Sequence, residues 1–183
     1  MRKIKIIFIV LLILFSMDPA FGQSGHFDRL NFLVGEWEGT GRGFGNESSV
    51  VESSFKLVMD GKYIEVKNES EFEPTEKNPE GEHHIDRGFI SYDKGRNATV
   101  LRQFHNEGYV TQYTLNDSLS NDSLLVFETE IIENFIPGGK ARWTIRKISE
   151  SRIETIFDLS FPEKDYTCMG TNILFRKDNG SSD

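Results

Sequence analysis

Residues 97–113, NATVLRQFHNEGYVTQY, contain the side chains of this chain that are best suited to chemistry. If this segment is a strand, its alternate residues point to opposite faces, so Arg102 and His105 lie on opposite faces. Neither face is clearly apolar, so the pattern leaves open which of the two side chains points inward. An inward arginine needs a carboxylate or an anionic ligand, because an unpaired buried charge is strongly destabilising. An inward imidazole titrates near neutrality and can bind a metal. The alternative is that His105 closes the HNEG turn and Arg102 lies on the surface.

Further polar and aromatic residues are candidates for lining the same interior. Tyr109 and Tyr113 offer hydroxyl groups on the segment that follows. Arg87 either enters the interior or pairs with Glu65 or Asp86 at the surface, and the pattern leaves both open. The predicted ligand-binding residues are Arg87, Arg102, His105, Tyr109, Tyr113, Phe127 and Trp143.

Motifs for covalent catalysis and for metal binding are missing from the sequence. The chain contains no GxSxG, HExxH, CxxC or P-loop pattern. His83 and His84 are adjacent, and successive strand residues point to opposite faces, so we expect solvated histidines rather than paired metal ligands. Cys168 is the only cysteine, which excludes an internal disulfide, and we expect it to be a small buried side chain. The sequence therefore predicts no catalytic residues and no metal site.

The elements that position these residues are predicted to be short strands. A short helix is expected near 27–33, and turn signals then recur at intervals of roughly ten residues. Connections this short make neighbouring strands antiparallel, and a meander of about ten strands removes its edges by closing. The predicted fold is an all-β, up-and-down barrel of about ten strands, with a two-sheet sandwich as the alternative. The strands are expected near 36–44, 49–59, 62–72, 84–92, 97–105, 109–116, 123–133, 140–148, 152–160 and 166–176.

Alternation along the strands predicts an interior rich in aromatic side chains. In residues 140–148, Trp143 belongs to an apolar set that alternates with arginines, so it should face inward. In residues 123–133, Phe127 and Ile131 belong to the set expected inside. Since eight strands already enclose enough room for one small ligand, about ten strands should leave a cavity.

The N-terminus predicts export. Residues 1–22 have a basic start, an apolar run and a small-x-small ending, the pattern of a secretory signal peptide; an uncleaved anchor is the alternative. The mature chain would be a single domain over residues 23–183 in the periplasm or outside the cell. Without the signal, 21 basic and 29 acidic residues become 18 and 28, a formal net charge near −10. Such a charge disfavours nucleic acid, and we expect no membrane insertion after cleavage.

A glycine-rich first strand carries a family resemblance. The stretch FLVGEWEGTGRG resembles the start of calycin-type barrels, in which a Gly-x-Trp follows a short helix and an arginine of the last strand covers the tryptophan. The whole mature chain resembles uncharacterised lipocalin-like secreted bacterial barrels and, more distantly, nitrobindins. Nitrobindins bind haem through a histidine near the last strand, but residues 166–176 contain no histidine. The residues expected to close the barrel are Gly35, Trp37, Gly39, Gly41, Gly43 and Arg176.

These observations predict a secreted or periplasmic barrel that holds a small, largely apolar or amphipathic ligand without catalysis. No cofactor is predicted, although the resemblance admits haem. The alternatives are a haem-binding or isomerase-like activity in the same barrel, and an envelope interaction protein with an incidental cavity. The ligand and the oligomeric state are left open by the sequence.

Overall fold

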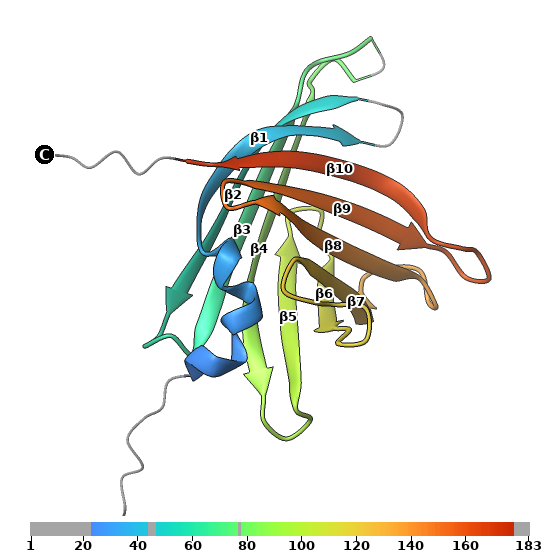
Figure 1. Cartoon of the computed structure of the whole chain (residues 1–183). Coiled ribbons are helices and arrows are strands. Elements are labelled where there is room, and N and C mark those ends of the chain that lie inside the picture. Colours follow the sequence, from blue (N-terminus) through green and yellow to red (C-terminus); the bar gives the residue numbers. More distant parts are fainter. Residues whose placement is uncertain (1–22, 44–46, 77, 178–183) are drawn as a thin grey trace, which may run out of the picture.

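The computed structural model describes residues 23–43, 47–76 and 78–177, so the predicted signal segment 1–22 lies outside the described residues. Ten antiparallel strands form one closed barrel, in which each strand pairs with its neighbours in sequence and β1 also pairs with β10 (Figure 1). The strands are β1 (Gly35–Gly43), β2 (Ser48–Val58), β3 (Tyr63–Phe72), β4 (Glu82–Asp93), β5 (Ala98–His105), β6 (Val110–Leu115), β7 (Leu124–Glu133), β8 (Lys140–Ser149), β9 (Arg152–Ser160) and β10 (Thr167–Arg176).

The predicted up-and-down barrel is confirmed. Every predicted strand is present, with ends that differ from the expected ones by at most two residues. Because β1 pairs with both β2 and β10, the sheet has no free edge, and the two-sheet sandwich is excluded.

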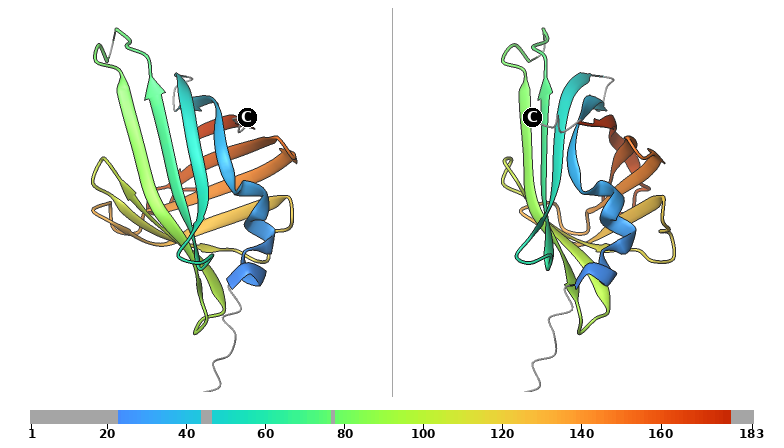
Figure 2. Two further views of the ribbon diagram at one scale, coloured as in Figure 1. Left: turned by 90° about the vertical axis from the view of Figure 1, so that its left-hand side faces the viewer. Right: turned by 60° about the vertical axis from the view of Figure 1, so that its left-hand side comes forward.

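A short helical segment covers one end of the barrel. It consists of two 3-10 helices, η1 (Gln23–His26) and η2 (Asp28–Leu33), and not of a regular α-helix. Phe27, Leu30 and Leu33 are buried and join the main core, which explains why so short a helix stays in place. Figure 2 shows this segment at one end and the β3–β4 hairpin extending beyond its neighbours at the other. Among the described residues, no helix is long and apolar enough to cross a membrane.

The seam between β1 and β10 is held by Trp37 and Arg176. The two residues are opposite each other in the strand register, and the guanidinium carbon of Arg176 lies 4.3 Å from the centre of the Trp37 ring. Arg176 also donates hydrogen bonds to the carbonyls of Val34 and Phe32, at 2.6 and 2.7 Å. Trp37 Nε1 donates to the carbonyl of Leu33 at 2.7 Å. One arginine therefore joins the first strand, the last strand and the end of η2.

Glycine is required on β1 because the backbones approach closely there. A Cβ atom at Gly39 would lie 2.0 Å from the carbonyl oxygen of Ile173 on β10, far inside van der Waals contact. Gly35 has a φ of 137° and faces the Arg176 guanidinium, so both its conformation and its surroundings exclude a side chain. These glycines allow β1 and β10 to close the barrel.

Ile131 and Cys168 lie beside register shifts, and the expectations about both side chains are wrong. Ile131 is 53% exposed, because the β6–β7 register shifts after Thr129 and brings Ile132 inward instead. Cys168 is exposed rather than buried, beside a shift in the β9–β10 register between Cys168 and Gly170. The inward orientation of Trp143 and Phe127 is confirmed.

Candidate functional site

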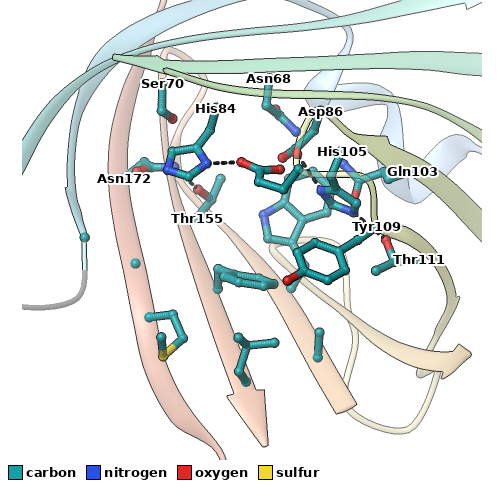
Figure 3. A pocket seen from close by; sticks show the side chains of 18 of the residues that line it. Asn68, Ser70, His84, Asp86, Gln103, His105, Tyr109, Thr111, Thr155 and Asn172 are labelled. Carbon is teal, nitrogen blue, oxygen red and sulfur yellow. Dashed lines mark hydrogen bonds and ion pairs between the residues drawn. The ribbon is translucent and has the colours of Figure 1, made fainter. Parts of the chain in front are cut away.

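A cavity of about 470 Å³ occupies the end of the barrel away from η2 (Figure 3). Its walls come from nearly all the strands and from the turns that join them at this end. The apolar wall includes Ile132, Phe135, Trp143, Phe157, Leu159 and Met169. The polar wall includes Asn68, Ser70, His84, Asp86, Gln103, His105, Thr111, Thr155 and Asn172.

Stacked aromatic side chains form the inner part of the apolar wall. The Trp143 ring lies 6.3 Å from the Phe55 ring at an interplanar angle of 11°, and 6.2 Å from the Phe127 ring. Trp143 lines the cavity, whereas Phe127 is fully buried behind it. This packing fixes the indole and gives the cavity a rigid aromatic surface.

The most connected polar group in the cavity is His105. Its Nδ1 lies 2.6 Å from Asp86 Oδ1, and its Nε2 lies 2.9 Å from Thr111 Oγ1. The pairing follows from the register, in which His105 at the end of β5 is opposite Asp86 on β4. The His105 side chain is 14% exposed, so the network faces the cavity from a largely buried position. A carboxylate that orients an imidazole in this way equips it to exchange a proton with a bound molecule.

Tyr113 extends this network into the core. Burial raises the pKa of its phenol, and a hydrogen bond with Thr111 only partly opposes that effect. Tyr113 therefore remains a neutral phenol over the ordinary pH range and acts as a hydrogen-bonding group.

A second histidine, His84, lies on the same wall. Its Nε2 is 3.0 Å from Glu82 Oε1, and its Nδ1 is in hydrogen-bonding contact with Glu107 Oε1. Glu107 belongs to the β5–β6 turn, which Asn106 fastens to β4 by donating to the His83 carbonyl at 2.7 Å. In Figure 3, His84, Asp86 and His105 lie on one side of the cavity.

The sequence prediction missed His84 because it placed the start of β4 at this residue. The strand begins two residues earlier, at Glu82, so His84 and Asp86 are alternate residues of a regular strand and share its inner face. The useful signal was this spacing of two residues between a histidine and an aspartate.

Four of the seven predicted ligand-binding residues line the cavity, and three do not: Phe127 lies buried behind Trp143, and Arg102 and Arg87 lie on the outer face. His105, Tyr109, Tyr113 and Trp143 are part of its wall. The placement of Arg102 in the cavity is wrong: Arg102 lies on the outer face and donates to Gln112 Oε1 at 2.9 Å. The physical reason is that the opposite set of β5, which ends in His105, faces inward and includes the fully buried Leu101.

Arg87 is also on the outside of the barrel. Its side chain is exposed on β4, between Lys67 of β3 and Phe104 of β5 in the register, so its predicted place in the cavity is wrong. The cause is the alternation of β4, in which the neighbouring Asp86 takes the inward position. The cavity thus receives the carboxylate of this pair and not the guanidinium.

Comparisons with known proteins support the fold. No protein-family model matches the chain, and no curated protein matches it. Rv2717c from M. tuberculosis is 12% identical, with a TM-score of 0.56 over 82% of this chain and 96% of that one. The S-type phycobiliprotein lyase CPES from Guillardia theta is 12% identical, with a TM-score of 0.48 over 85% of this chain and 93% of that one. This chain is therefore similar in fold to Rv2717c, as a closed barrel.

Proposed function

We propose that this protein binds one small amphipathic organic molecule in the cavity of its barrel. The observation that carries the proposal is a cavity of about 470 Å³ with an aromatic and aliphatic wall facing a wall of hydrogen-bonding groups. The volume is in the range of small-molecule sites, and the division of the walls suits a ligand with one polar and one apolar end. The resemblance to calycin-type barrels supports the same proposal.

The apolar part of the ligand would lie against Trp143, Phe157 and Leu159. Burial of apolar surface contributes roughly 25 cal/mol per Å², so this wall supplies most of the affinity. Since Trp143 is already held by Phe55 and Phe127, little side-chain freedom is lost when a ligand binds there.

The polar end of the ligand would lie near His105. The carboxylates that line the cavity are Glu47, Glu82, Asp86 and Glu107, against one guanidinium, that of Arg42, and the Arg102 guanidinium lies outside the barrel. Because carboxylates accept hydrogen bonds and repel anions, this wall favours a head group that donates hydrogen bonds, such as an alcohol, an amide or an amine, over a bare anion.

The proposed ligand is not haem. Iron in haem takes an axial ligand perpendicular to a large planar ring, but the histidines lining the cavity have both ring nitrogens in contact with neighbouring side chains. The ring would have to displace Glu107 from His84, or Asp86 or Thr111 from His105. The residues of this wall do not fit that group.

The binding proposal is tested by a pair of phenylalanine substitutions. Phe157 lines the cavity, whereas Phe104 is exposed on the outer face of β5. With the neutral dye Nile red as the probe, Phe157→Ser should raise the Kd by about 10-fold, because part of the apolar wall is lost. Phe104→Ser should leave the Kd unchanged. Fluorescence titration measures both.

Two results would contradict the binding proposal. The first is equal weakening of dye binding by both substitutions, which would place the dye on exposed surface. The second is the absence of saturable binding in the unchanged protein. Urea unfolding of both variants shows whether Phe157→Ser acts on binding or on folding.

We further propose that the protein is exported and that residues 1–22 are removed, on the strength of the signal-peptide pattern. Intact mass measurement of the protein from its own source should give a chain beginning at Gln23. A full-length chain retained inside the cell would argue against export.

A further inference from the structure

Three potential metal ligands meet on the polar wall of the cavity, and a second histidine contacts one of them. The ligand atoms of Asp86, His105 and Glu107 all lie within 4.8 Å of one another, and His84 Nδ1 contacts Glu107 Oε1. His84 and Asp86 come from β4, His105 ends β5 and Glu107 lies in the turn that follows. Imidazole nitrogens and carboxylate oxygens are common ligands of divalent transition metals.

The two histidines are arranged alike. In each ring, Nδ1 faces a carboxylate of the cluster: Glu107 for His84, and Asp86 for His105. In each ring, Nε2 faces a group outside the cluster. These outer partners are Glu82, at 3.0 Å from His84, and Thr111, at 2.9 Å from His105.

This arrangement leaves a position for a cation. A neutral imidazole has one N–H, and if it is donated outward from Nε2, the Nδ1 lone pair points at a carboxylate oxygen. Two lone pairs facing each other repel unless a proton lies between them or both bind one metal ion. Outer hydrogen bonds to Nε2 are also the usual means by which proteins fix the tautomer and orientation of a metal-binding histidine.

The β5–β6 turn holds Glu107 in place. The side-chain Oδ1 of Asn106 accepts a hydrogen bond from the backbone amide of Ile85 at 2.9 Å. The backbone amide of Asn106 donates to the Ile85 carbonyl at 3.0 Å. These bonds, with the one from Asn106 to the His83 carbonyl, fasten the β5–β6 turn against β4. The fastened turn therefore keeps the Glu107 carboxylate next to His84.

We propose that His105 Nδ1, Asp86 and Glu107 bind one divalent transition-metal ion of the Zn²⁺ type, with His84 orienting Glu107 through its contact with Oε1. Ligand atoms around such an ion lie about 3.3 Å apart, so His105 Nδ1 and Asp86 Oδ1, now 2.6 Å apart, would separate slightly to bind it. All three ligands line the cavity, so the ion would lie on its polar wall. The proposal does not depend on the organic ligand, because the metal is bound by the chain alone.

The experiment uses untagged, metal-free protein and Co²⁺ as the probe, followed by its visible absorption, with Zn²⁺ as the competitor. We expect one equivalent of Co²⁺ to bind and to be displaced by Zn²⁺. His84→Ala should weaken Co²⁺ binding by about 10- to 100-fold, because the partner that orients Glu107 is lost. The matched control is His83→Ala, one residue earlier on β4, where the exposed side chain lies outside the cluster; its affinity should be unchanged.

A second variant separates metal binding from folding. Glu107→Gln preserves the size of a side chain in a partly exposed turn, so the barrel should keep its stability in urea while Co²⁺ affinity falls. The proposal is overturned if the unchanged protein binds no Co²⁺ at millimolar concentration. It is also overturned if His83→Ala and His84→Ala weaken binding equally. Nile red titration of the metal-free protein distinguishes failure of this site from failure of the proposed organic-ligand site.

Discussion

Gly39→Ala should prevent the barrel from closing. The added Cβ would lie 2.0 Å from the Ile173 carbonyl oxygen and 3.0 Å from Leu174 Cα, both of which are backbone atoms of β10. Neither can move away without separating the two strands and breaking the ladder that runs from Trp37 to Gly43. We expect the free energy of unfolding to fall by at least about 3 kcal/mol, or the protein to remain unfolded. Urea unfolding followed by tryptophan fluorescence measures the change.

The matched control is Gly25→Ala in η1. No atom lies within 4 Å of a Cβ built there, so the same substitution should change the stability by less than about 0.5 kcal/mol. At Gly41 the closest atoms belong to the Asn172 and Ser49 side chains, which can rotate, so Gly41→Ala should have an intermediate effect. If Gly39→Ala were as stable as Gly25→Ala, the close approach of β1 and β10 would not be a requirement of the fold.

Arg176→Met should cost about 3 kcal/mol of stability. The methionine keeps much of the apolar stem but removes the donors to the carbonyls of Phe32, Val34 and Glu150. Hydrogen bonds that involve a charged group make a net contribution of about 1.5–3 kcal/mol each, and the contact with the Trp37 ring adds about 0.5–2 kcal/mol. Because Arg176 is only partly buried, we expect a total well below the sum of these values. Equilibrium urea unfolding is the measurement.

Arg152 provides the comparison for Arg176. Its guanidinium carbon lies 5.5 Å from the centre of the Phe175 ring, but both side chains are exposed. Arg152→Met should therefore change the stability by no more than about 0.5 kcal/mol. Equal losses from the two substitutions would show that the bonds from Arg176 to the carbonyls before β1 contribute nothing. Arg176→Lys should recover only part of the loss, because an ammonium cannot reach all three carbonyls with a planar fork.

The strands could be predicted because their ends are marked by local chemistry. Gly, Asn and Asp clusters separate segments of β-branched and aromatic residues, and both signals act over a few residues. Closure was also predictable, because short connections permit only antiparallel neighbours. The seam residues Trp37 and Arg176 were found through the family resemblance, and the structure places them in contact.

The site was harder to predict because the inward face of a strand depends on register. In β5 the alternating sets contain Arg102 and His105, and only the pairing with Asp86 on β4 shows that the histidine faces the cavity. On β7 a single extra residue reverses the orientation of Ile131. The proximity of His84 to Glu107 depends on a turn more than twenty residues away in sequence, so no local pattern contains it.

The covered end of the barrel also determines how the molecule can be attached. β10 ends beside the start of β1, with the Lys177 amide bonded to the Glu36 carbonyl, and η2 enters β1 at the same end. The cavity lies at the other end. A tether, a surface or a fused domain joined to the chain before η1 or after β10 would therefore attach at the end opposite the cavity. The protein could then be immobilised for ligand capture without blocking its own site.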